Sequence, residues 1–161
     1  MTAGTLLDVK GLSVRFAMPR RSLFGERPVL HAVRGVSFSL RPGRTLGLVG
    51  ESGSGKTTTA MASIRLVEAH SGAVMFDGVD LLKLDAEAMR RHRRHLQVIF
   101  QDPYSSLNPR ERVGAIVREP LDLMMPGTSR AERTERVGEL FGLVGLRPDQ
   151  MALFPHQFAG G

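Results

Sequence analysis

The sequence predicts an α/β fold organised around a phosphate-binding loop, and three observations point to this fold class. A glycine-rich stretch at residues 50–57 follows an apolar run at residues 45–49 and precedes apolar residues at helical spacing. Other short apolar runs with strand character lie on both sides of this unit. The 161 residues are 42% hydrophobic and 24% charged, which is the balance of a globular chain with a core.

The residues before the loop predict strands. Residues 5–16 alternate loosely between apolar and polar and predict one or two strand pieces, whereas the prolines and arginines of residues 17–28 indicate an exposed loop. Residues 33–40 alternate as a half-buried strand does, and the Pro-Gly turn at residues 41–44 predicts a hairpin. Residues 45–49 are apolar throughout, which predicts a parallel strand buried on both faces.

Strand and helix patterns alternate after the loop. Residues 72–78 predict a short strand closed by an Asp-Gly turn, and residues 96–100 predict a second buried strand. Between them, Asp85 is expected to cap a short helix that ends in the basic run of residues 90–95. Directly after the loop, four apolar residues at helical spacing predict a helix that packs on the sheet, namely Ala60, Met61, Ile64 and Val67.

The last third of the chain predicts helices. Residues 103–157 read as a small helical subdomain, in which Pro120 kinks or ends the first helix. Ser129 and Glu132 have the spacing of a capping box, and Gly145 stops the helix that the box begins.

The glycine-rich loop carries the chemistry, since it fits the pattern G-x-x-x-x-G-K-[ST] without a mismatch. Glycines let successive backbone N–H groups turn inward on a phosphate chain. Lys56 is expected to reach the β and γ phosphates, and Thr57 to offer its hydroxyl to Mg²⁺, at the positive end of the following helix. The predicted nucleotide-binding residues of the loop are Gly50, Glu51, Ser52, Gly53, Ser54, Gly55, Lys56, Thr57 and Thr58.

ATP-hydrolysing proteins with such a loop usually hold Mg²⁺ with an Asp at the end of a second buried strand. Two residues follow apolar runs in this way, Asp77 and Gln101. Asp77 precedes Gly78, which favours a hairpin turn over a metal site. Gln101 can ligate Mg²⁺ through its carbonyl oxygen but cannot act as a strong base. The expected metal ligands are therefore Thr57 and Gln101.

Charge and composition narrow the class of partner. The net charge of +6 favours an anionic partner such as a nucleotide, a nucleic acid or an acidic membrane surface. No aromatic residues interleave with residues 90–95, which favours a solvated helix end over a nucleic-acid site. The histidines at 92, 95 and 156 lack the neighbours of a metal site and are expected to be packing or surface residues. There is no cysteine and no long apolar run, so we expect a cytoplasmic chain without disulfides.

Several stretches together resemble the ATP-binding subunits of ABC transporters, in particular the oligopeptide and dipeptide import branch. They are VSFSL at 36–40, TLGLVGESGSGKTT at 45–58, SGAVMFDG at 71–78, VIFQDPYSSLNP at 98–109, EPL at 119–121 and FPHQFAGG at 154–161. The likeness runs from about Leu6 to the last residue. It implies a P-loop NTPase of the ABC type, with a RecA-like core, an antiparallel β subdomain and the start of a helical subdomain. It also implies two parts, which are the N-terminal part of the nucleotide-binding core at residues 1–102 and the helical subdomain at residues 103–161. The implied fold is incomplete.

The resemblance also implies roles outside the loop. Gln101 would be the Q-loop glutamine, which touches Mg²⁺ and transmits the nucleotide state to the helical subdomain, whereas Asp77 would have no catalytic role. Phe16 would stack on adenine, with a packing role in the core as the alternative. Four residues match the start of the signature motif, which faces the ATP of a second subunit: Phe158, Ala159, Gly160 and Gly161. The commoner form has Leu-Ser in place of Phe-Ala, so the hydroxyl that serine offers the γ-phosphate is absent.

The resemblance therefore predicts a subunit that couples ATP binding and hydrolysis to peptide import at the cytoplasmic face of the cell membrane. Its expected cofactors are ATP and Mg²⁺, and its expected partners are a second ATP-binding subunit, in a homo- or heterodimer, and transmembrane permease subunits. Two alternatives are a non-catalytic nucleotide-binding fragment and a P-loop ATPase associated with nucleic acid.

The residues after Gln101 bear on whether this chain can hydrolyse ATP. No Asp-Glu pair after a buried strand follows Gln101, and no later histidine fits a γ-phosphate switch. We therefore assign no catalytic residue, expect the sequence to be cut at the signature motif, and expect the 161 residues alone to bind ATP weakly without hydrolysing it.

Overall fold

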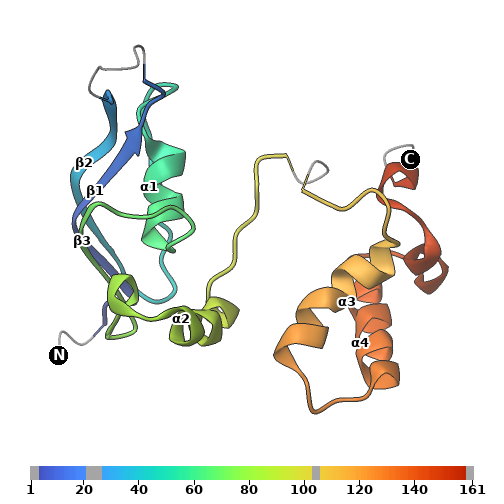
Figure 1. The fold of residues 1–161 in the computed structure, drawn as a ribbon. Helices are drawn as coiled ribbons and strands as arrows, with labels where there is room; N and C mark the ends of the chain where they lie inside the picture. The colour runs from blue at the N-terminus through green and yellow to red at the C-terminus, as the bar shows by residue number, and fades with distance from the viewer. Residues whose placement is uncertain (1–3, 21–26, 103–105, 159–161) are drawn as a thin grey trace. The chain divides into compact units, whose positions relative to one another are not determined.

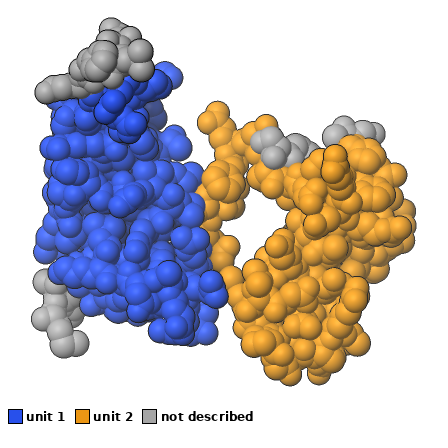
Figure 2. Space-filling model, in the orientation of Figure 1, with its two compact units in different colours: residues 1–96 blue, residues 97–161 orange. Residues whose placement is uncertain are grey.

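The computed structural model describes residues 4–20, 27–102 and 106–158. It divides into two compact units, residues 1–96 and 97–161, which Figure 2 shows in different colours. Each unit has buried apolar side chains of its own. Within the described ranges, no helix combines the length and the apolar character that crossing a membrane requires.

The first unit is built on a four-stranded antiparallel sheet with the strand order β2-β1-β3-β4 (Figure 1). β1 (Leu7–Ala17) pairs with β2 (Val29–Leu40) on one edge and with β3 (Ser71–Phe76) on the other. β4 (Val79–Asp80) continues the sheet beyond β3. The strands predicted within residues 5–16, 33–40 and 72–78 are therefore confirmed. The hairpin partner of β2 is β1, which precedes it, so the predicted hairpin beyond residues 41–44 is wrong.

Asp77 lies in the turn between β3 and β4. Asp77 is exposed in a left-handed conformation with φ of 46°, and its N–H donates to the carbonyl oxygen of Leu6 at 2.9 Å. Asp77 and Gly78 thus form the tight connection of a hairpin, as predicted.

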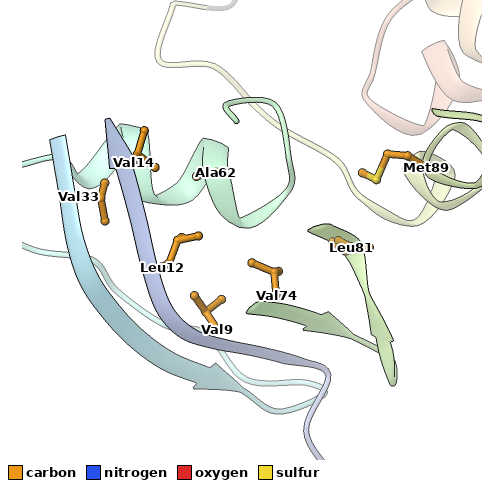
Figure 3. Close-up of a cluster of buried hydrophobic side chains, with 8 residues drawn as sticks. All are labelled: Val9, Leu12, Val14, Val33, Ala62, Val74, Leu81 and Met89. Atoms are coloured by element: carbon orange, nitrogen blue, oxygen red, sulfur yellow. The ribbon is translucent and has the colours of Figure 1, made fainter. Parts of the chain in front are cut away.

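Helices complete the core of the first unit. α1 (Lys56–Ser63) packs on the sheet, and α2 (Ala86–His92) begins after Asp85, whose Oδ1 accepts from the N–H of Ala88 at 2.7 Å. Two short 3-10 turns, η1 (Leu81–Lys83) and η2 (Arg93–His95), flank α2. The buried cluster in Figure 3 draws on β1, β2, α1, β3, η1 and α2: Val9, Leu12, Val14, Val33, Ala62, Val74, Leu81 and Met89.

The apolar stripe predicted for the first helix is wrong in its detail. α1 ends at Ser63, and its buried residues are Thr59, Ala62 and Ser63. The hydroxyls of Thr59 and Ser63 donate to carbonyl oxygens one turn earlier, at 2.9 Å and 2.8 Å, so these polar residues can be buried at low cost. Of the predicted stripe, Ala60 is exposed, and both Ile64 and Val67 lie beyond the helix.

The parallel strand predicted at residues 45–49 and the buried strand predicted at residues 96–100 are also wrong. Residues 45–49 and 96–100 form neither helix nor strand, and the side chains of Val49 and Ile99 are 93% and 94% exposed. A parallel strand is stable only between neighbours that satisfy its backbone and cover both its faces. All the strand pairs among the described residues are antiparallel, and none includes these two segments.

The second unit is helical, as predicted. α3 (Val113–Met124) continues through Pro120 instead of ending there, and α4 (Arg130–Leu143) buries Val137 and Phe141. Two 3-10 turns, η3 (Pro148–Ala152) and η4 (Pro155–Gln157), follow α4.

The predicted boundaries of α4 are confirmed. The Ser129 hydroxyl accepts from the N–H of Glu132 at 3.2 Å, and the Glu132 carboxylate accepts from the N–H of Ser129 at 2.6 Å, which completes the capping box. Beyond the other end, Gly145 has a φ of +76°, as a helix-ending glycine does.

Candidate phosphate-binding site

The predicted phosphate loop leads directly into the N-terminus of α1. Gly55 is the N-cap residue, and its carbonyl oxygen accepts from the N–H and the hydroxyl of Thr59, at 2.8 Å and 2.9 Å. These two bonds fix the first turn of the helix. The first N–H groups of a helix have no partner within it, so this end of α1 attracts an anion.

Lys56 lies folded against the loop that it follows. Its Nζ donates to the carbonyl oxygens of Gly50 at 2.8 Å and Glu51 at 2.7 Å. Glu51 also accepts from the N–H of Ser54 at 3.2 Å, so the loop is a closed turn with its cation bound to its own backbone. Phosphate oxygens carry negative charge and make stronger bonds with an ammonium group than carbonyl oxygens do. A phosphate can therefore replace these two carbonyl oxygens as the partner of Lys56.

Gly55, within the loop, lies against strand β2. A β-carbon at Gly55 would lie 2.3 Å from the carbonyl oxygen of Ala32, and Gly55 has a φ of +89°. The register of the β1–β2 ladder shifts at this point, since Val14 pairs with Val33 and Arg15 with His31. Only glycine allows the loop to approach the strand so closely, which ties the loop to the hairpin.

A cavity of about 570 Å³ lies beside the loop. Its lining combines the end of β1, the middle of β2, the loop and the first turn of α1: Phe16, Leu30, His31, Ala32, Val33, Arg34, Val36, Gly53, Ser54, Gly55, Lys56, Thr57, Thr58 and Thr59. Most of the predicted site residues of the first unit therefore border one space. Gly50, Glu51 and Ser52 belong to the same loop but not to this lining.

Phe16 lines the cavity and is 40% exposed. The alternative of a core phenylalanine is therefore wrong for this position. Phe16 pairs with Leu30 across the ladder, and both side chains border the cavity. An apolar wall of this kind suits the face of an aromatic ring.

His31 and Arg34 also line this cavity, and no motif in the sequence predicted either residue. The pKa of His31 is lowered, first by partial removal from water and then by the positive charges of Arg15, Arg34 and His70. Its imidazole is therefore neutral at pH 7 and can donate or accept a hydrogen bond. In a regular strand, residues three positions apart lie on opposite faces, so alternation does not predict that both line one cavity. The register shift at Ala32 interrupts this alternation.

The remaining predicted site residues belong to the second unit. Gln101 is exposed and follows the extended segment at residues 96–100, and its role beside the loop stays a prediction. Of the signature residues, Phe158 is half-buried just after η4. Ala159, Gly160 and Gly161 lie outside the described residues.

Comparison with known families decides what this loop belongs to. A family profile described as "ABC transporter" matches residues 33–161, which is most of the chain. The chain belongs to the ABC transporter family. Its fold agrees, since a dimeric bacterial ABC transporter cassette, MJ0796, matches with a TM-score of 0.78 at 24% identity, over 96% of this chain and 63% of that one. The same cassette in a post-hydrolysis state bound to ADP and Pi matches with a TM-score of 0.76 at 23% identity, over 94% and 62%.

Curated relatives of this ABC transporter chain are named as transport or import ATP-binding proteins. The oligopeptide transport ATP-binding protein OppF of Haemophilus influenzae is 46% identical over 97% of this chain and 48% of its own length. The glutathione import ATP-binding protein GsiA of Salmonella paratyphi A is 46% identical over 97% of this chain and 25% of its own length. The chain thus spans about half the length of OppF and a quarter of GsiA. The predicted resemblance to the ABC family and its peptide-import relatives is confirmed.

Proposed function

We propose that this chain is the ATP-binding part of a transporter that imports small peptides. The observation that carries the proposal is the shared cavity: the phosphate loop, the N-terminus of α1 and Phe16 all border it. Family membership supports the proposal, as do the names of the relatives, which refer to transport of oligopeptides and import of glutathione.

The cavity offers a place for each part of a nucleotide. The loop N–H groups and Lys56 suit the phosphates, Phe16 suits the adenine ring, and β2 supplies polar side chains between them. Thr57 and Gln101 offer oxygen atoms, and oxygen atoms are the donors that Mg²⁺ takes in proteins. ATP bound there would supply the free energy for transport, and Mg²⁺ would neutralise charge on its phosphates.

The proposed partners follow from the same family. Residues 158–161 would face the nucleotide of a second ATP-binding subunit, and the dimeric cassette structure supports such a pairing. We place residues 1–102 in the nucleotide-binding core and residues 103–161 in a helical subdomain that contacts permease subunits at the cytoplasmic face of the membrane. Because the named relatives are import proteins, we do not propose a nucleic-acid function.

Nucleotide titration of a Lys56→Ala variant tests the proposal. We expect the unmodified chain to bind Mg·ATP and the variant to bind it about tenfold to a hundredfold more weakly, because a charge-assisted contact to phosphate is lost. Lys83→Ala is the matched control, since Lys83 is 83% exposed and pairs only with Asp80 in the described structure. Equal ATP affinity of the two variants would contradict the proposal.

Measurement of phosphate release tests whether the 161 residues alone hydrolyse ATP. The sequence has no Asp-Glu pair after a buried strand to activate water, so we expect the 161 residues alone to bind ATP without turning it over. ATPase activity that disappears with Lys56→Ala would overturn this part and leave the proposed binding role intact.

A further inference from the structure

A second basic cavity lies in the first unit, and its lining differs from that of the phosphate loop. Its volume is about 330 Å³, and it is lined by Arg65, Ala86, Met89, Arg90 and Arg93. Three of the five lining residues carry a guanidinium group and none carries a carboxylate. A positive potential is therefore concentrated in one small concave space.

Arg65 is held in place by backbone contacts from another part of the chain. Its Nη1 donates to the carbonyl oxygens of Leu81 at 3.0 Å and Leu84 at 2.6 Å, and its side chain is half-buried. The Arg65 backbone has a φ of +57°, an unusual conformation for a residue with a side chain. Such a conformation persists only where its surroundings enforce it, and it occurs often at ligand sites.

Arg90 and Arg93 come from one face of the next helical segment. Ala86, Met89, Arg90 and Arg93 have the spacing i, i+3, i+4 and i+7, which places them along one side of α2 and η2. Met89 is 3% exposed and forms an apolar floor. Among the described residues, the side chains of Arg90 and Arg93 have no ion pair or hydrogen bond.

Three carboxylates within residues 80–87 already have partners. Glu87 pairs with Arg91, Asp80 pairs with Lys83, and Asp85 caps α2 through the N–H of Ala88. The charges of Arg90 and Arg93 are therefore not neutralised within this part of the chain. Cations stabilise the C-terminal end of a helix, which explains one or two basic residues at the end of α2. It does not explain why Arg65 is held in the same cavity by backbone contacts.

We propose that Arg65, Arg90 and Arg93 form a binding site for a phosphate group. The planar fork of a guanidinium matches two phosphate oxygens at once, and a pre-positioned Arg65 loses little freedom on binding. The group belongs either to a small phosphorylated molecule or to the headgroup of an acidic phospholipid, which share this chemistry. The site is separate from the phosphate loop and does not depend on the proposed transport role.

The test compares two double variants with equal loss of charge. Arg90→Gln/Arg93→Gln removes both cations of the helix from the cavity, whereas Arg41→Gln/Arg44→Gln removes two cations of the turn after β2 that do not line it. All four positions are exposed, so both variants are expected to fold. Both are made in the Lys56→Ala background, so that binding at the phosphate loop is suppressed, and circular dichroism checks their folding.

The first arm titrates inorganic phosphate by calorimetry, and the second measures sedimentation with phosphatidylcholine vesicles that contain or lack phosphatidylglycerol. We expect Arg90→Gln/Arg93→Gln to weaken binding about tenfold or more in one arm, with the control close to its parent. The arm that responds identifies the source of the phosphate group. Equal weakening by both double variants, or binding in neither arm, would overturn the proposal.

Discussion

Gly55 and Ala32 approach so closely that a β-carbon on the glycine would lie 2.3 Å from the carbonyl oxygen of Ala32. The first residue ends the phosphate loop, and the second lies in strand β2, more than twenty residues earlier in the chain. The contact makes the hairpin a fixed support for the loop. It also makes the requirement for glycine at position 55 partly structural.

Gly55→Ala is therefore expected to be more harmful than Gly53→Ala. Both residues have positive φ, at +89° and +79°, but a β-carbon at Gly53 would meet nothing within 4 Å. The shared conformational cost is about 1–2 kcal/mol, and the backbone clash at Gly55 adds about 1–3 kcal/mol. Urea denaturation of the two variants measures the difference. If both lose the same stability, the contact with Ala32 contributes nothing.

Phe16→Ala is expected to weaken ATP binding by about tenfold, because stacking on a base is worth about 1–3 kcal/mol. Inorganic tripolyphosphate has no base, so its affinity for the variant should equal that for the unmodified chain. Calorimetric titration with both ligands gives the comparison. A parallel loss for both would show that Phe16 supports the loop and does not contact adenine.

Asp122→Ala is expected to loosen the packing of α3 against α4. The Asp122 carboxylate lies 3.1 Å from Nε of Arg118 and 3.0 Å from Nε of Arg133, and the Arg133 side chain is 17% exposed. Removing the carboxylate leaves a buried guanidinium nitrogen without its charge partner, at a cost of about 1–2 kcal/mol. Hydrogen exchange of the α3 and α4 amides should accelerate accordingly.

The matched control for Asp122→Ala is Glu139→Ala. Glu139 pairs with Arg136 on the surface of α4, where both side chains are more than half exposed. Exposed pairs contribute about 0–1 kcal/mol, so exchange should change little. Equal acceleration in the two variants would mean that Asp122 has no special role between the helices.

Glu132 predicts a pH dependence for the start of α4. Its pKa is lowered from 4.5, first by the backbone hydrogen bond from Ser129, then by the Ser129 side chain, with a smaller contribution from Arg133. Because the folded pKa is lowered, ionised Glu132 stabilises the capped helix above about pH 4.5, and this contribution is lost as the pH falls through the folded pKa. Hydrogen exchange in the first turn of α4 should therefore separate the unmodified chain from Glu132→Gln at pH 6. The two should converge in acid, and a constant difference across this range would contradict the assignment.

Local patterns predicted those elements whose partners lie nearby in the sequence. The β3–β4 hairpin, the cap at Asp85 and the capping box at Ser129 each depend on a few adjacent residues, and all three are confirmed. The phosphate loop is similar, because its glycines and Lys56 lie within one short stretch. Residues 45–49 and 96–100 have equally clear strand patterns, but a parallel strand requires neighbours that its own pattern does not specify.

The candidate site was predictable only in part for a related reason. Lys56 and Phe16 were found from a motif and from a resemblance, whereas His31 and Arg34 line the cavity because the ladder shifts register at Ala32. A register shift of this kind depends on the pairing of two strands. No pattern within β2 alone indicates it.

The exposed segment at residues 45–49 has a practical consequence for any work with the isolated chain. Leu46, Leu48 and Val49 are 44%, 41% and 93% exposed, with no charged residue between them. A short uncharged run with high β-propensity and free backbone groups is a template for intermolecular β-sheets. The isolated chain should therefore aggregate as its concentration rises, and the Lys56 experiments are best performed on dilute protein, with light scattering recorded alongside each titration.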